Sequence, residues 1–489
     1  MSSSLTGKVG YISFGRALAS VSSIIAGAIL SRYLTKDTYG TYRQLWLVYN
    51  TLYPLIVLGI PTSVNYFIPQ LKDEDRKAFN AQTFSILTFG GAILSAAFFF
   101  GAPLITGIFH NPALIPVARL FALIPILTLP TLYYQNLFIC LDRPILVAGL
   151  SAGLAFGRLV AVGVPVIMGY GLNGVLIGLL VFSFVQLFIV AYLMFRPFGL
   201  RVGSWKVGLL FQQFRYAFPI GIASIVGTLT KQLDKIVISS FFAASQYAVY
   251  ANGAIEIPLI GIVTGSVTAV LMPEFVRLNA RGKPERLVAL WHSAICKVAL
   301  IILPVMIFLL IYAPEFLTLL FSSKYAESAT IFRVYLLALP IRVTTFGTIL
   351  LSIGLSRLIM RYSLYTLVLN IGLNYLFMKT VGFVGPAIGT VIATYFIAYL
   401  QLRKIASVMN SSLRAIFPWS ILGKTIGVAF VAGAASIWPK LFYSRLPSLL
   451  DLLYGGGTYA VVFIVSAVWS KLIKKDDLKN LLREVLRPK

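Results

Sequence analysis

Eight charged residues lie within stretches that are otherwise apolar, and their chemistry is the most informative feature of this chain. Six are basic and two are acidic, namely Arg16, Arg158, Lys231, Lys235, Lys297, Arg342, Asp234 and Glu256. A charge in the middle of an apolar, membrane-length segment costs about 2.5–3.5 kcal/mol or more, so such residues should face a protein interior or water. Arginine and lysine bind phosphate through charge-assisted hydrogen bonds. The basic excess therefore predicts a cavity that receives an anion.

The depth of each basic residue separates candidates for binding from candidates for anchoring. At about 1.5 Å per helical residue, four of them lie well inside their segments, namely Arg16, Arg158, Lys231 and Arg342. We predict that these four line the anion site. Lys235 and Lys297 lie nearer the ends of their segments, where a lysine can extend to the headgroups. Lys231 and Asp234, three residues apart, also fit a pair that only neutralises itself.

Asp234 and Glu256 are acids that lie well inside the apolar segments, and we predict that any coupling to H⁺ or Na⁺ acts on one of them. Asp234 lies in the stretch from Phe214 to Tyr250. When ionised it would compete with a bound anion for Lys231, and when protonated it would release Lys231. No other cofactor and no metal site are expected.

Polar and aromatic residues accompany the charges. We predict that five of them line the same cavity, namely Tyr49, Asn50, Asn252, Asn370 and Asn374. Rings and amides suit sugar hydroxyls, but hydrogen bonding between helices explains such residues equally well. Asn370 and Asn374 share one helix face.

The composition predicts an all-α polytopic membrane protein. The chain has 489 residues, of which 58% are hydrophobic and 11% charged, and the apolar residues come in blocks of membrane-spanning length. The net charge of +26 is expected to report orientation and contact with anionic membrane lipids, since no soluble domain is available to hold nucleic acid. Paired catalytic carboxylates, nucleophile motifs and phosphate loops are missing from the sequence. The protein is therefore predicted not to be an enzyme.

Fourteen membrane spans are predicted from the apolar blocks: 9–31, 44–68, 81–108, 119–141, 145–169, 173–195, 216–242, 247–272, 289–320, 331–354, 362–379, 384–402, 421–438 and 452–470. The loops on one side, with both termini, hold 26 basic residues, and those on the other side hold nine. By the positive-inside rule, this bias predicts that both termini are cytoplasmic.

An internal repeat with a period near 210 residues covers six spans. Ser31, Tyr39 and Tyr42 recur as Ser239, Tyr247 and Tyr250. Later matches continue the repeat, namely Ala102-Pro103 with Ala313-Pro314, Leu141 and Arg143 with Leu355 and Arg357, and Gly171, Gly174 and Gly178 with Gly382, Gly385 and Gly389. Because six is even, the two copies should cross the membrane in the same direction.

The repeat predicts two six-helix lobes and two further segments. We place an N-terminal lobe at 1–195, a cytoplasmic interfacial linker at 196–215 and a C-terminal lobe at 216–410. The remainder, 411–489, is predicted to form an extra helix pair and a basic amphipathic tail on the cytoplasmic surface.

The run from Gly15 to Leu45, GRALASVSSIIAGAILSRYLTKDTYGTYRQL, resembles the start of bacterial polysaccharide exporters, the O-antigen or oligosaccharide flippases. That family shares a superfamily with the MATE antiporters and the lipid II flippase. The resemblance implies a V-shaped, two-lobe, MATE-like transporter in a bacterial or archaeal cytoplasmic membrane. It would move an undecaprenyl-pyrophosphate-linked oligosaccharide by alternating access. Polysaccharide polymerases and glycosyltransferases of the same pathway would be partners.

Two alternatives stay open beside this interpretation. Fourteen spans also resemble the lipid II flippases, but those carry a basic-acidic pair in the first helix, whereas Arg16 is followed by Ala17. A MATE-type exporter of small cations is the second alternative. A cationic substrate should prefer an acidic cavity, which the basic excess does not provide.

The topology can be tested with reporter fusions at Gly171, Ala244 and Gly382. All three positions should read as periplasmic, because the basic bias places both termini in the cytoplasm and five, seven and eleven predicted spans precede these positions. A cytoplasmic signal at any one of them would contradict the predicted six-span repeat.

Overall fold

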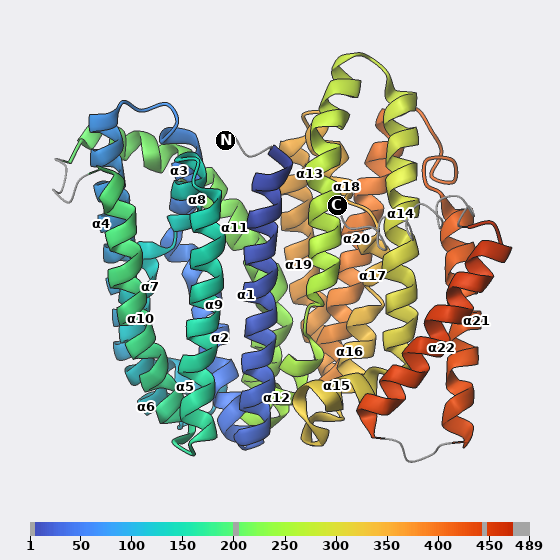
Figure 1. Cartoon of the computed structure of the whole chain (residues 1–489), viewed down its shortest axis with the longest axis horizontal. Helices are drawn as coiled ribbons and strands as arrows, with labels where there is room; N and C mark the ends of the chain where they lie inside the picture. Colours follow the sequence, from blue (N-terminus) through green and yellow to red (C-terminus); the bar gives the residue numbers. More distant parts are fainter. Residues whose placement is uncertain (1–4, 199–204, 443–446, 473–489) are drawn as a thin grey trace. The chain divides into compact units, whose positions relative to one another are not determined.

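The computed structural model describes residues 5–198, 205–442 and 447–472 (Figure 1). The side chains of residues 5–14, 16 and 439–442 lie outside the described part. Across these ranges the regular elements are all helices, as the composition predicts. The chain divides into two compact units, Met1–Ala251 and Asn252–Lys489, and each is described by itself below.

The described part of the first unit contains eleven α-helices: α1 (Leu5–Tyr33), α2 (Lys36–Val57), α3 (Ile60–Phe67), α4 (Asp73–Phe100), α5 (Ala102–Phe109), α6 (Leu114–Phe121), α7 (Leu123–Thr128), α8 (Tyr134–Cys140), α9 (Pro144–Ile167), α10 (Gly171–Phe195) and α11 (Val207–Phe241). Short 3-10 turns follow α7 and α10, at Leu129–Thr131 and Arg196–Phe198. Helix α12 (Ala244–Gly253) crosses the boundary between the units.

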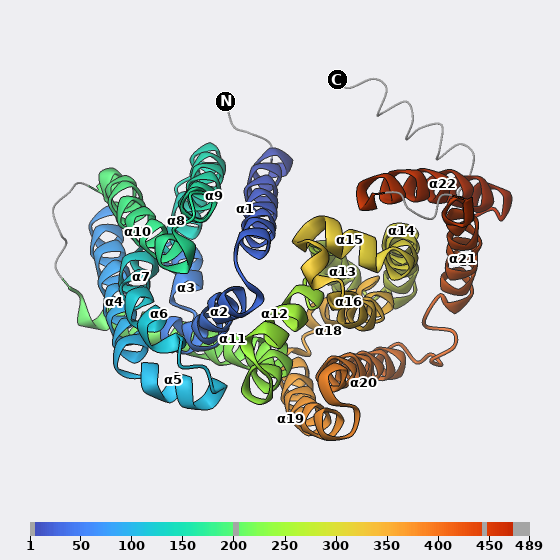
Figure 2. The same cartoon turned by 90° about the horizontal axis from the view of Figure 1, so that it is seen from below.

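Up to residue 472, the described residues of the second unit form ten α-helices: α13 (Pro258–Ala280), α14 (Pro284–Ile311), α15 (Ala313–Phe321), α16 (Ser328–Leu336), α17 (Leu339–Arg342), α18 (Phe346–Ser352), α19 (Ser356–Val381), α20 (Gly385–Val408), α21 (Trp419–Phe442) and α22 (Ser448–Trp469). Two 3-10 turns, Ser323–Tyr325 and Gly382–Val384, precede α16 and α20. The last two helices lie side by side (Figure 1, Figure 2).

Ten helical segments of the described chain are long and apolar enough to cross a membrane, or up to twelve if each of two bent pairs is one span. One of the ten, Ser356–Val408, contains both α19 and α20, and the apolar part of α1 adds the shorter helix Ala17–Tyr33. The helical membrane architecture is therefore confirmed. The predicted number of fourteen spans stays a prediction.

Several predicted spans are broken or shifted in the structure. The predicted spans 81–108 and 289–320 each contain a break, at Gly101 and at Tyr312, after which a proline occupies the first turn of a new short helix. Proline has no N–H to continue a helical ladder, so the chain restarts there. Helix α11 begins at Val207, so the end of the predicted linker 196–215 is part of that helix. Residues 199–204 and the predicted amphipathic tail beyond residue 472 lie outside the described residues.

The internal repeat is visible in the order of the helices. Both bounds of α4 recur in α14 with a shift of 211 residues, and α5 and α15 begin with the same shift, at Ala102 and Ala313. Gly171 and Gly382, which the repeat aligns, both have positive φ angles, of 60° and 81°. Only glycine adopts such angles without strain, so these matches serve the same turn in both copies.

Helix α11 is held in the first unit by a buried polar network and by a close backbone approach. The Gln213 side-chain nitrogen donates to Ser63 Oγ at 3.1 Å and to Thr83 Oγ1 at 3.0 Å. The break between α2 and α3 lies against the same helix, because a Cβ on Gly59 would lie 2.7 Å from the carbonyl oxygen of Ala217. Helix α11 thus belongs to the compact unit 1–251, while the predicted division into lobes at 195 and 216 stays a prediction.

The motif that carries the family resemblance builds the corner between α1 and α2. Thr35 caps α2, since its side chain accepts from the N–H of Thr38 at 3.2 Å. Gly40, one turn further, packs directly on the backbone of Ala244 at the start of α12. Gln44 then donates to Ser239 Oγ on α11 at 3.0 Å. These contacts fix α2 antiparallel to α11.

We expect Gly40→Ala to destabilise the protein, because the added Cβ would lie 1.9 Å from the carbonyl oxygen of Ala244. Overpacking of this kind costs about 1–3 kcal/mol or more. Thermal unfolding of the purified protein in detergent would measure the loss as a lower Tm. Gly153→Ala on α9 is the matched control, since nothing lies within 4 Å of its Cβ position. Equal melting of both variants would contradict the close approach.

Candidate functional site

A cation on α9 rests on an aromatic ring of α2. The guanidinium carbon of Arg158 lies 4.6 Å from the ring centroid of Trp46. Helix α9 is placed by α1, where Ser22 Oγ donates to the carbonyl oxygen of Ala155 at 2.7 Å, and the two helices lie side by side (Figure 1). A cation within about 6 Å of a tryptophan ring is attracted by its π-electrons.

None of the described side chains neutralises the positive charge of Arg158. Its side chain is exposed although it lies in a membrane-spanning helix. Its guanidinium makes neither a hydrogen bond nor an ion pair with any residue that the structure describes. Because lipid cannot solvate an arginine at this depth, the charge requires water or an anion.

Lys231 lies at the same depth as Arg158. Arg158 is nine residues from the end of α9, Trp46 is ten residues from the start of α2, and Lys231 is ten residues from the end of α11. At 1.5 Å per residue, each lies about 14–15 Å from the end at which the corner α1–α2 and the start of α12 meet. Lys231 is also exposed. The structure thus brings two of the four predicted basic residues to one level of the first unit.

Asp234 is buried and is bound by partners other than Lys231. The hydroxyl of Tyr250 donates to it at 3.0 Å, and the amine of Lys235 lies 3.4 Å from both of its oxygens. Lys235 also donates to the carbonyl oxygen of Lys231 at 2.9 Å. Asp234 therefore pairs with Lys235, and the side chain of Lys231 remains exposed. The sequence allowed the side chain of Lys235 to extend to the headgroups. In the structure its amine instead lies toward Asp234 and the carbonyl oxygen of Lys231.

In the second unit, Arg342 and Glu256 form an ion pair at 3.4 Å. Their predicted roles differ, anion binding for Arg342 and ion coupling for Glu256. Both side chains are largely exposed, at 46% and 67%. Each also lies where a helix is interrupted: Glu256 precedes α13, and Arg342 ends α17. Helix breaks bring polar backbone groups to membrane depth, which is tolerated only beside protein or water.

The predicted polar lining divides into exposed and buried residues. Asn50 is exposed. Tyr49 is partly buried between the rings of Tyr53 and Trp46, whose centroids lie 5.9 and 5.3 Å from its own. Asn252 is fully buried.

Asn370 and Asn374 are also buried, and the side-chain nitrogen of Asn374 donates to the oxygen of Asn370. Thr390 of α20 approaches both, at 3.5 and 3.4 Å. This pair therefore joins α19 to α20, which is the helix-to-helix alternative that the sequence left open.

Arg16 lies on α1, but its side chain is outside the described residues. Trp46 was missed by the sequence analysis. Its signal was the spacing of Tyr42, Trp46, Tyr49 and Tyr53, which places four rings on one face of a helix. A row of rings on a helix face is more often core packing than a site, so the pattern alone did not identify it.

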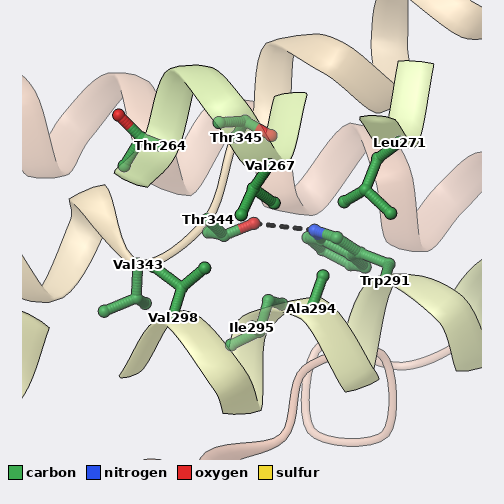
Figure 3. A pocket seen from close by; sticks show the side chains of 10 residues that line it. All are labelled: Thr264, Val267, Leu271, Trp291, Ala294, Ile295, Val298, Val343, Thr344 and Thr345. Atoms are coloured by element: carbon green, nitrogen blue, oxygen red, sulfur yellow. Dashed lines mark hydrogen bonds between the residues drawn. The ribbon is translucent and has the colours of Figure 1, made fainter. Parts of the chain in front are cut away.

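A small cleft in the second unit lies between α13, α14 and the segment after α17 (Figure 3). The indole N–H of Trp291 donates across it to Thr344 Oγ1 at 2.7 Å. Its lining contains threonines and apolar side chains but no charged residue, so it does not suit an anion. Among the described side chains, no cluster of His, Cys, Asp or Glu could hold a metal ion.

The fold and the site define a polytopic helical membrane protein with two cations at mid-span, Arg158 and Lys231, that no described acid neutralises. The family model described as polysaccharide biosynthesis protein matches residues 29–330, which is more than half of the chain. The chain therefore belongs to this family, and the resemblance carried by residues 15–45 is confirmed.

A curated relative from Haloferax volcanii, a probable low-salt glycan biosynthesis flippase, is 20% identical over 277 residues. This match covers 56% of the present chain and 57% of the relative, so it extends over little more than half of either protein.

Solved structures resemble the whole fold. The lipid II flippase MurJ in an inward closed conformation matches with a TM-score of 0.71 and 14% identity, over 94% of this chain and 98% of that one. A multidrug resistance MATE family transporter in an inward-facing conformation matches with a TM-score of 0.61 and 16% identity, over 83% and 96%. A MOP superfamily transporter from Pyrococcus furiosus matches with a TM-score of 0.57 and 16% identity, over 83% and 94%. At these identities the likeness concerns the fold alone, and it confirms the predicted MATE-like fold class.

Proposed function

We propose that this protein is a flippase that moves a lipid-linked oligosaccharide across the cytoplasmic membrane. The observation that carries the proposal is the exposed guanidinium of Arg158 at mid-span, which no described side chain neutralises, with Lys231 at the same depth. Membership of the polysaccharide biosynthesis family supports a glycan as the cargo. The name of the curated relative supports flipping as the activity.

The proposed substrate carries its sugar on undecaprenyl pyrophosphate, as a repeat unit of O-antigen, capsule or exopolysaccharide. The lipid chain stays in the bilayer while the pyrophosphate and the sugar pass through the protein interior. A pyrophosphate at mid-membrane has lost its water, and two cations at that depth replace part of that stabilisation. No bond is made or broken, so the protein acts by binding and alternating access rather than as an enzyme.

The same charges weigh against a small cationic drug as the substrate. Such a molecule would meet Arg158 and Lys231 without a nearby free carboxylate, since Asp234 is buried against Lys235. Lipid II shares the undecaprenyl-pyrophosphate group with the proposed substrate, so the transport assay below includes it as a competitor.

We further propose that Glu256 rather than Asp234 responds to a proton or sodium ion. Glu256 is exposed and holds Arg342, whereas Asp234 is inaccessible. Neutralising Glu256 would free Arg342 for the anion, and restoring its charge would return Arg342 to the acid. This exchange provides a release step, which an anion held by fixed positive charges requires.

The setting of the protein follows from this activity. Anionic lipids on the cytoplasmic side would contact the basic loops and both termini. The enzymes that build and consume the lipid-linked sugar, namely glycosyltransferases and a polymerase, would be its partners in the pathway.

Arg158→Ala and Lys231→Ala should each slow flipping at least about tenfold, because a hydrogen bond to a charged group contributes about 1.5–3 kcal/mol. The measurement is translocation of labelled undecaprenyl-pyrophosphate-linked sugar in proteoliposomes, with unlabelled lipid II as competitor. Lys297→Ala is the control, since it removes an exposed cation on α14. Normal rates in both site variants would remove the anion site from the mechanism.

Glu256→Gln should abolish the dependence of flipping on an imposed proton or sodium gradient while leaving flipping without a gradient in place. Asp234→Asn should instead lower protein yield and Tm, because it removes the carboxylate that faces Lys235 in the buried cluster. Both are measured in the same vesicles, with Glu274→Gln of the exposed pair with Arg277 as the control. If both variants keep gradient-driven flipping at the wild-type rate, neither acid is the coupling site.

A further inference from the structure

The arginines of the first unit differ in how their side chains are fixed. Arg32 donates to the carbonyl oxygen of Ala28, and Arg43 donates to that of Ala251, at 3.0 and 2.9 Å. Arg76 is bound by a backbone carbonyl and by an acid. Each of these three arginines donates N–H groups to other atoms of the protein. Arg158 is fixed by none of the described hydrogen bonds, and the ring of Trp46 is its contact.

A ring holds a cation without neutralising it. A carboxylate at the position of Trp46 would cancel the charge and occupy the N–H donors of Arg158. The π-electrons of indole attract the guanidinium through the ring face and use neither. The five N–H groups stay available to an incoming phosphate, which the planar fork of arginine binds in a bidentate manner.

Trp46 itself is packed among three other rings. The rings of Tyr49 and Phe121 meet it edge-on at centroid distances of 5.3 and 5.2 Å, and the ring of Tyr42 lies at 6.2 Å. Two residues before it, Gln44 ties α2 to Ser239, and its oxygen accepts from Asn111 at 2.7 Å. Trp46, the residue on which Arg158 rests, is therefore positioned both by neighbouring rings and by the hydrogen bonds of Gln44 on the same helix.

We propose that Trp46 is the positioning residue that presents Arg158 to the phosphate of the substrate. The proposal rests on the proposed function, since it assumes that Arg158 receives an anion. It also assigns a preference: the site should favour lipid phosphates, which accept two parallel N–H bonds, and arginine should exceed lysine at position 158.

The test measures binding of undecaprenyl pyrophosphate to the purified full-length protein in nanodiscs, with the uncharged alcohol undecaprenol as the reference probe. Trp46→Leu should weaken binding of the pyrophosphate about 2- to 30-fold, the range expected for loss of a cation–π contact. Trp46→Phe should lie between wild type and Trp46→Leu. Tyr375→Leu is the matched control, because it removes the exposed cation–π contact with Lys379 in the second unit.

A thermodynamic cycle separates positioning from packing. If Trp46 acts through Arg158, then Trp46→Leu has no further effect on binding in an Arg158→Ala background. An equal loss of binding in both backgrounds would overturn the proposal, and so would full binding by Trp46→Leu with an unchanged Tm. Full binding by Arg158→Lys would overturn the assigned preference for arginine.

Failure of the proposed function has a different signature. In that case the wild-type protein would bind undecaprenyl pyrophosphate no better than undecaprenol, before any variant is compared. A wild type that distinguishes the two probes, together with an Arg158→Ala variant that does not, upholds the anion site whatever Trp46 contributes.

Discussion

A charge inside an apolar span must find a partner other than lipid, and the interior of this protein is arranged around that constraint. Asp234 is buried beneath Tyr250 and Lys235. Arg342 meets Glu256 at two helix breaks. Arg158 has only the face of Trp46 among its described contacts. The first arrangement makes the charge structural, and in the proposed mechanism the second makes it exchangeable. The third holds a cation in place while leaving its charge and donors for another molecule.

Helix α2 serves both the packing of the first unit and its candidate site. Near its start, Gly40 packs on α12, and in its middle Gln44 forms a hydrogen bond with α11. Just after its end, Gly59 lies against α11. Trp46 lies on the same helix, next to Gln44. A helix fixed at three points moves little relative to its neighbours, so a cation resting on it is presented in one orientation. Pre-organisation of this kind lowers the entropic cost of binding.

The two copies of the repeat share their scaffold but not their charges. Helices α4 and α14 correspond residue for residue in their bounds, and the same turn glycines recur. Lys231, Asp234 and Lys235 of α11 have the uncharged residues Ser23, Ala26 and Gly27 as counterparts in the first copy. Arg43 likewise has no charged counterpart, and it donates instead to the carbonyl of its own repeat equivalent, Ala251. Duplication thus accounts for the helical frame, and the departures from it account for the chemistry.

The sequence by itself determined the helical membrane class, the repeat, the family and the identity of the intramembrane charges. Those features depend on composition, on apolar block length and on local spacing, all of which are properties of neighbouring residues in the chain. Only the tertiary structure decided which charges meet. It paired Asp234 with Lys235, joined Glu256 to Arg342, and set Arg158 on Trp46. The physical reason is that membrane helices are apolar on the faces that meet lipid and on those that meet protein, so periodicity does not reveal which face packs on which neighbour. Contacts between helices far apart in the chain follow from that packing alone.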